Sequence, residues 1–110
     1  MDTKFLSLEA LLMEVLEAKQ DYEIAFYKFG GKNGESLQKK NYVVFQFWQL
    51  AWGFTQNQIE LLKKLSDTLF LIEDKNCIDG ANNDLLELMK LIDLKIKYYE
   101  LKNKLFSNLV

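Results

Sequence analysis

The sequence contains no proline, no histidine and no arginine, since all 14 of its basic residues are lysine. Without histidine, the chain lacks the side chain that exchanges protons near neutral pH and the commonest metal ligand of proteins. Without arginine, it lacks the planar fork that binds phosphate or carboxylate through two hydrogen bonds. These absences argue against most familiar catalytic and nucleic-acid-binding sites. The same bias, with heavy use of Lys, Asn, Ile and Phe, suggests an AT-rich bacterial or phage gene.

Positive charge is in slight deficit, because 14 lysines stand against 16 acidic residues and give a net charge of −2. An acidic chain repels polyphosphate, so we expect no nucleic-acid partner. The single cysteine, Cys77, cannot form an internal disulfide, which fits a cytoplasmic location.

Long apolar runs are also missing. The longest uncharged run, residues 41–59, carries six glutamine or asparagine side chains, Asn41, Gln46, Gln49, Gln56, Asn57 and Gln58. It is too polar to be a membrane span. Acidic residues at positions 9, 14 and 17 interrupt the N-terminal region where a signal peptide would need an apolar stretch. We therefore expect neither a membrane span nor a secretion signal.

With 110 residues, 49% of them apolar, the chain has the size and composition of a single domain, residues 1–110. Its apolar residues recur at helical rather than alternating spacing in four segments. The sequence therefore predicts an all-α fold, an antiparallel four-helix bundle. The expected helices span about residues 4–29, 36–53, 56–74 and 85–108.

Local signals mark several of these helix boundaries. Gly30 is placed to end the first helix, and Thr55 with Gln58 forms a capping box at the start of the third. Asp84 is expected to cap the fourth helix. Residues 42–48 are rich in β-branched and aromatic side chains and leave a strand as an alternative there. No other segment offers such a strand a partner.

Two loops resemble ligand-binding motifs only superficially. Residues 30–36 are glycine-rich, but Asn33 rather than Ser or Thr follows Lys32, and a helix precedes the loop. In residues 74–80, placing Gly80 at the required sixth position of a calcium loop puts Lys75, Cys77 and Leu86 at the first, third and twelfth positions, and none of these supplies the carboxylate needed there. The cysteine has no histidine to activate it. We therefore expect no metal, no cofactor and no catalytic residues.

Two helices carry more apolar surface than a single core face requires. In residues 36–53, aromatic and aliphatic residues cover most of the circumference, so either the helix is buried on several sides or Trp48 or Trp52 anchors a partner. In residues 85–108, a second apolar stripe runs beside the first, with Lys95 and Lys102 between them. This stripe, which either widens the core face or meets a second chain, comprises Leu91, Leu94, Tyr98, Leu101 and Leu105.

An acidic strip, Glu14, Glu17 and Asp21, lies on the polar face of the first helix. It is either a solvated face or a contact surface for a basic partner. The first and last helices are also longer than the middle pair, so their ends should project from the bundle. These features predict a protein-protein interaction module, such as a regulator, inhibitor, immunity-type neutraliser or chaperone, with a homodimer slightly favoured over a foreign partner. A small enzyme using carboxylate, lysine or cysteine chemistry and a purely structural homodimer are the alternatives.

Overall fold

The structure is a computed structural model that describes residues 3–109. Within that range the chain forms helices and short connections, with no strand, so the prediction of an all-α fold is confirmed. Residues 42–48, the candidate strand, are helical. The helices are α1 (Thr3–Gly30), α2 (Glu35–Lys40), α3 (Tyr42–Gly53), α4 (Ile59–Asp74) and α5 (Asn82–Leu109), with 3₁₀ turns at Lys32–Gly34 and Gln56–Gln58.

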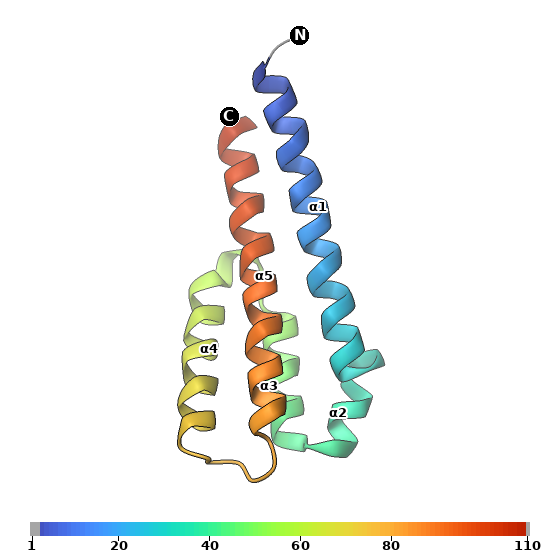
Figure 1. Cartoon of the computed structure of the whole chain (residues 1–110), viewed down its shortest axis with the longest axis vertical. Coiled ribbons are helices and arrows are strands. Elements are labelled where there is room, and N and C mark those ends of the chain that lie inside the picture. The colour runs from blue at the N-terminus through green and yellow to red at the C-terminus, as the bar shows by residue number, and fades with distance from the viewer. Residues whose placement is uncertain (1–2, 110) are drawn as a thin grey trace.

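The bundle is built on two long antiparallel helices, α1 and α5, each of 28 residues (Figure 1). The shorter α3 and α4, of 12 and 16 residues, pack beside only one half of this pair. The other halves of α1 and α5 project beyond them as a two-helix segment that also holds both chain ends. We call this segment, α1 up to about Lys19 and α5 beyond Asn103, the overhang; Glu100 and Asn103 still contact Lys63 of α4 and Gln56 just before it. It makes the molecule elongated, with principal extents of 57 × 26 × 19 Å.

The expected helix over residues 36–53 is two helices, because the chain breaks at Asn41. The backbone of this residue is extended (φ −154°), and its side-chain oxygen accepts a hydrogen bond from the backbone N–H of Val44 (3.2 Å). Asparagine is among the preferred N-cap residues, since its side chain satisfies a backbone donor that a helix start leaves free. Asn41 therefore starts α3 instead of continuing α2.

The core runs the length of the bundle, and α5 lies at its centre between α1 and α4. Both apolar stripes of α5 are consequently used inside the chain. Residues of the first stripe, Leu85, Leu88 and Ile92, have no exposed surface. Residues of the second stripe are buried or partly buried as well.

The predicted capping box at the start of the third helical segment is present. The backbone N–H of Thr55 donates to Oε1 of Gln58 (2.9 Å), and Phe54 and Ile59 on either side pack against the core. Replacing Thr55 with alanine should lower the free energy of unfolding by about 1 kcal/mol. Urea denaturation measures this loss, and an unchanged midpoint would show that the threonine side chain contributes nothing to the cap.

None of the helices formed by residues 3–109 is both long enough and apolar enough to cross a lipid bilayer.

Candidate functional site

The most unusual side chain of the bundle is Lys95 of α5, which is only 1% exposed. Its Nζ donates hydrogen bonds to the carbonyl oxygens of Ala51 (2.8 Å) and Trp52 (2.5 Å). Both carbonyls belong to the last turn of α3, where the helix leaves acceptors free and its dipole favours a positive charge. Lys95 therefore ties the end of α3 to the middle of α5.

Four aromatic rings surround this ammonium group. The Nζ of Lys95 lies 5.6 to 5.9 Å from the ring centroids of Tyr22, Phe26, Trp52 and Tyr99, within the range of cation–π attraction. Within residues 7–109, no carboxylate forms an ion pair with it. The hydroxyl of Tyr99 donates to the carbonyl of Phe54 (2.9 Å). The resulting lysine cage joins α1, α3 and α5.

The lysine cage should make stability depend on pH. Burial lowers the pKa of Lys95 to about 8, whereas the unfolded chain keeps the proton up to about pH 10.5. Between these values the unfolded state binds more protons than the folded state, so the free energy of unfolding should rise as the pH is raised. Burial raises the pKa of Tyr22 and of Tyr99 above 10.0, so stability should fall again at higher pH.

Urea denaturation at intervals from pH 7 to pH 11 measures this profile. The wild-type chain should have its highest denaturation midpoint near pH 10, and the Lys95→Met variant should lack the rise between pH 8 and pH 10. An identical rise in both chains would assign it to groups other than Lys95.

Lys95 was placed between two apolar stripes from the sequence, with no role assigned to it. Its burial follows from the packing of α3 over this part of α5, because the α3 carbonyls accept its hydrogen bonds and Trp52 covers its ammonium group. Lys102, which lies between the same stripes beyond the end of α3, is only partly buried. The sequence alone therefore did not distinguish the two lysines.

A second feature lies on the overhang, where α1 and α5 have no further helix beside them. A groove of about 490 Å³ is lined by Leu8, Glu9, Leu12, Leu105 and Leu109. Leu12 is 44% exposed and Leu109 is 59% exposed. Four of the five lining residues are leucine, so the groove offers an apolar surface for another helix.

The groove continues the surface on which α3 packs. On α5, Lys95 contacts the last turn of α3 and Tyr99 contacts Phe54 directly after it. Seven residues further along, close to two helical turns, stand Lys102 and Phe106. The residue seven positions beyond Lys102 is Leu109. The face of α5 that receives α3 therefore extends along the overhang.

The same continuation holds for α1. Phe26 contacts the rings of Trp48 and Trp52 on α3, and Lys19 and Leu12 precede it by seven and fourteen residues. On both long helices, the face against which α3 packs therefore continues beyond the end of α3. Figure 1 shows no helix there.

The tryptophans considered as partner anchors belong mainly to the core. Trp48 is buried, and its Nε1 donates to the carbonyl of Phe26 (3.1 Å). Trp52 is partly buried and stacks on Trp48 with an interplanar angle of 1°. The buried residues of α3, Val44, Phe45, Trp48 and Ala51, follow one face of the helix, so Trp48 is unavailable as an exposed anchor. The apolar surface of the helix is only partly used in the core, because Tyr42, Val43 and Leu50 are exposed.

The second stripe of α5 is likewise occupied within the chain. Leu91, Tyr98 and Leu105 are buried, and Leu94 and Leu101 are partly buried against the core. Their burial removes the argument that this stripe as a whole is free for a second chain. Among these residues, Leu105 alone lines the overhang groove.

The acidic strip lies on another side of the overhang. Glu14, Glu17 and Asp21 are exposed and line a hollow of about 260 Å³ that also includes Lys97 and Leu101. Glu14 follows Leu12 by two residues, or about 200° around the helix, so the strip faces away from the groove. In the described part of the chain, no three His, Cys, Asp or Glu side chains are grouped closely enough to hold a metal ion.

Comparison with protein-family models, with curated proteins and with solved structures found no match to this chain. Its class is that of a small antiparallel helical bundle, and a function has to be argued from its surfaces.

Proposed function

We propose that this chain is a protein-protein interaction module that binds a helix of its partner in the overhang groove. The observation that carries the proposal is the apolar groove between two helix ends that nothing else in the described chain covers. Grooves of this kind receive the apolar face of an amphipathic helix. Covering them removes apolar area from water, at about 25 cal/mol per Å² before the costs of association.

The surroundings of the groove support binding of a protein rather than a small molecule. The groove is open along its length, and exposed apolar side chains extend beyond its lining, at Leu16 (53% exposed) and Phe106 (48% exposed). Glu9 supplies a charged group in the lining, and Lys102 precedes the lining residue Leu105 by three positions, close to one helical turn. An apolar centre with a polar rim is the usual anatomy of a protein interface.

A module of this kind acts by occupying its partner, as regulators, inhibitors, immunity-type neutralisers and chaperones do. An enzyme using lysine chemistry is the weaker alternative, because the ammonium of Lys95 is enclosed by aromatic rings and backbone carbonyls. Lys95 is absent from the linings of the five main surface hollows of the described residues. A substrate would have no route to it in this conformation.

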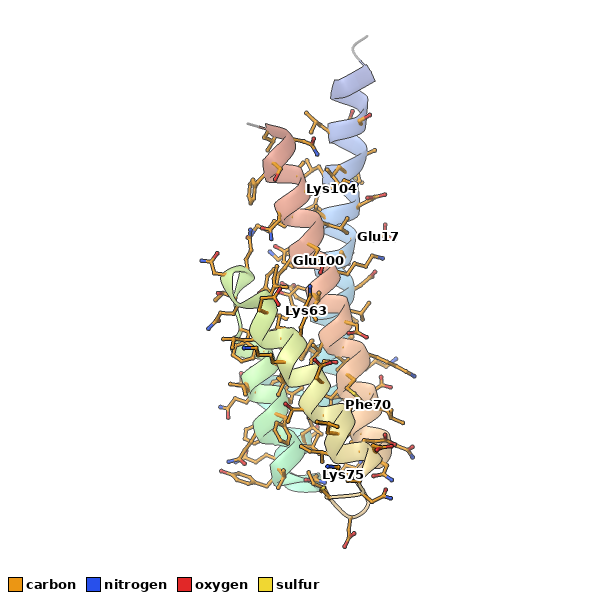
Figure 2. All side chains as sticks on the ribbon, turned by 90° about the vertical axis from the view of Figure 1, so that its left-hand side faces the viewer. Glu17, Lys63, Phe70, Lys75, Glu100 and Lys104 are labelled. Atoms are coloured by element: carbon orange, nitrogen blue, oxygen red, sulfur yellow. The ribbon has the colours of Figure 1, made fainter. Side chains whose placement is uncertain are left out.

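Site-specific photo-crosslinking tests the proposal. A photoreactive amino acid is introduced at Leu12, in the groove, and separately at Glu17, on the acidic strip, which Figure 2 labels on the overhang. In the cells that naturally produce the chain, irradiation should give a discrete protein adduct from position 12 and little from position 17. Equal or absent labelling at the two positions would overturn the proposal, and labelling at position 17 alone would assign binding to the acidic strip.

A further inference from the structure

We infer that the helix received by the overhang groove is α1 of a second copy of this chain, with the two overhangs packed antiparallel. The inference rests on the proposed function, because it names the partner of the same groove. The overhangs of the two copies would then lie side by side, and four helices would surround the apolar centre that two helices now leave open.

The shape of the overhang suits this arrangement. The segment of α1 that lines the groove is itself a helix with an unpaired apolar face, on which Leu8, Leu12 and Leu16 recur every four residues. Two identical faces related by a twofold axis cover each other without any further element. The pairing would remove from water the exposed surfaces of Leu12, Leu16, Phe106 and Leu109 together.

The charges on the groove face select the antiparallel direction. Glu9 stands near the free end of the overhang, and Lys19 stands near its base, ten residues or about 15 Å further along α1. Lys102, at the base on α5, lies over the rings of Tyr98 and Phe106. Antiparallel packing brings Glu9 of each copy to Lys19 of the other, whereas parallel packing would bring like charges together.

The same register has a consequence for the apolar residues. With Glu9 opposite Lys19, Leu12 of one copy lies opposite Leu16 of the other, on either side of the twofold axis. Glu14, Glu17 and Lys104 line other hollows of the overhang and remain outside the contact.

Sedimentation equilibrium at tens of micromolar tests the charge pairing. The wild-type chain should be a dimer, and Glu9→Lys or Lys19→Glu alone should weaken dimerisation on the order of tenfold, because two symmetric pairs become repulsive. The double variant Glu9→Lys/Lys19→Glu should restore it. Glu17→Lys, the matched control with the same change of charge outside the contact, should leave it unchanged. Equal effects of Glu9→Lys and Glu17→Lys, or no rescue in the double variant, would overturn the antiparallel register.

Disulfide trapping tests the register of the leucines. In a chain whose exposed Cys77 is replaced by serine, Leu12→Cys and Leu16→Cys are made separately and mixed under oxidising conditions. The antiparallel register predicts a faster 12-to-16 disulfide than either 12-to-12 or 16-to-16. Preferred self-pairing of each variant would favour parallel packing and overturn the inference. Far-UV circular dichroism should show that all variants remain helical.

The two proposals can fail separately. A wild-type chain that stays monomeric at 100 µM would overturn the inference that a second copy occupies the groove. A photo-adduct at position 12 whose mass differs from that of a dimer would still support the groove as a binding site for another protein. An adduct at twice the 13.0 kDa mass of the chain supports both proposals.

Discussion

Replacing Lys95 with alanine is expected to lower the free energy of unfolding by about 3 to 5 kcal/mol. Part of this loss is the cavity left by a long buried side chain, which costs about 2 to 5 kcal/mol for comparable residues. The carbonyls of Ala51 and Trp52 also lose their donor, and buried acceptors without a partner are costly. The effect should be among the largest of any single substitution in this chain.

Lys102→Ala is the matched control, since Lys102 lies one heptad further along α5 and also stands over aromatic rings. It is partly exposed and forms no hydrogen bond to a helix end within the described residues. Its replacement should cost less than about 1 kcal/mol. Guanidinium denaturation of the two variants measures the difference. Similar losses in both would mean that the ammonium of Lys95 does not secure the end of α3.

The Lys95→Met variant distinguishes the contribution of the side-chain volume to stability from that of the charged ammonium group. Methionine fills much of the same volume but cannot donate to the α3 carbonyls, and it also avoids the burial of a charge. The loss in stability should therefore be smaller than for Lys95→Ala. A methionine variant as unstable as the alanine variant would assign the effect to the donated hydrogen bonds rather than to the cavity.

Gly34→Ala should be the second severely destabilising change, with a loss of about 3 kcal/mol or more. The residue has φ +76°, where a Cβ atom is strained. An added Cβ would also lie 2.6 Å from Cε2 of Phe45 and 2.7 Å from Cζ3 of Trp48, both ring atoms in the packed core. Neither ring can withdraw without disturbing its neighbours.

Gly80→Ala isolates the backbone part of this effect. Gly80 has a similar φ of +71°, but nothing lies within 4 Å of an added Cβ. Its replacement should cost about 1 kcal/mol, the penalty of the left-handed conformation alone. Thermal denaturation of both variants gives the comparison. Equal losses at the two positions would show that the rings of Phe45 and Trp48 accommodate the extra atom.

Features that depend on neighbouring residues in the chain were predictable. Helical spacing of apolar residues located the four long helical stretches, and Thr55 with Gln58 marked a helix start that the structure contains. The unequal helix lengths predicted the overhang, because length depends only on where caps and breaks fall in the sequence. The break at Asn41 was missed although asparagine before an apolar run is a capping signal.

Features that depend on which faces meet were not predictable. Leu91, Tyr98 and Trp48 carry the apolar character expected of an interface, but the fold uses all three in its own core. Periodicity gives the angle of a residue around its helix, and several packings satisfy the same set of angles. The local sequence pattern of α5 fits equally well with packing of its two stripes against two helices of the same chain and with packing of one stripe against a second chain.

The sequence by itself determined the helical class, most helix boundaries and the excess length of α1 and α5, since each follows from local spacing and capping. Tertiary structure alone decided that Lys95 is enclosed and that the apolar groove lies beyond the end of α3. The reason is physical: an amphipathic helix carries the same face wherever it packs, and only the positions of the other helices decide which part of that face remains in water.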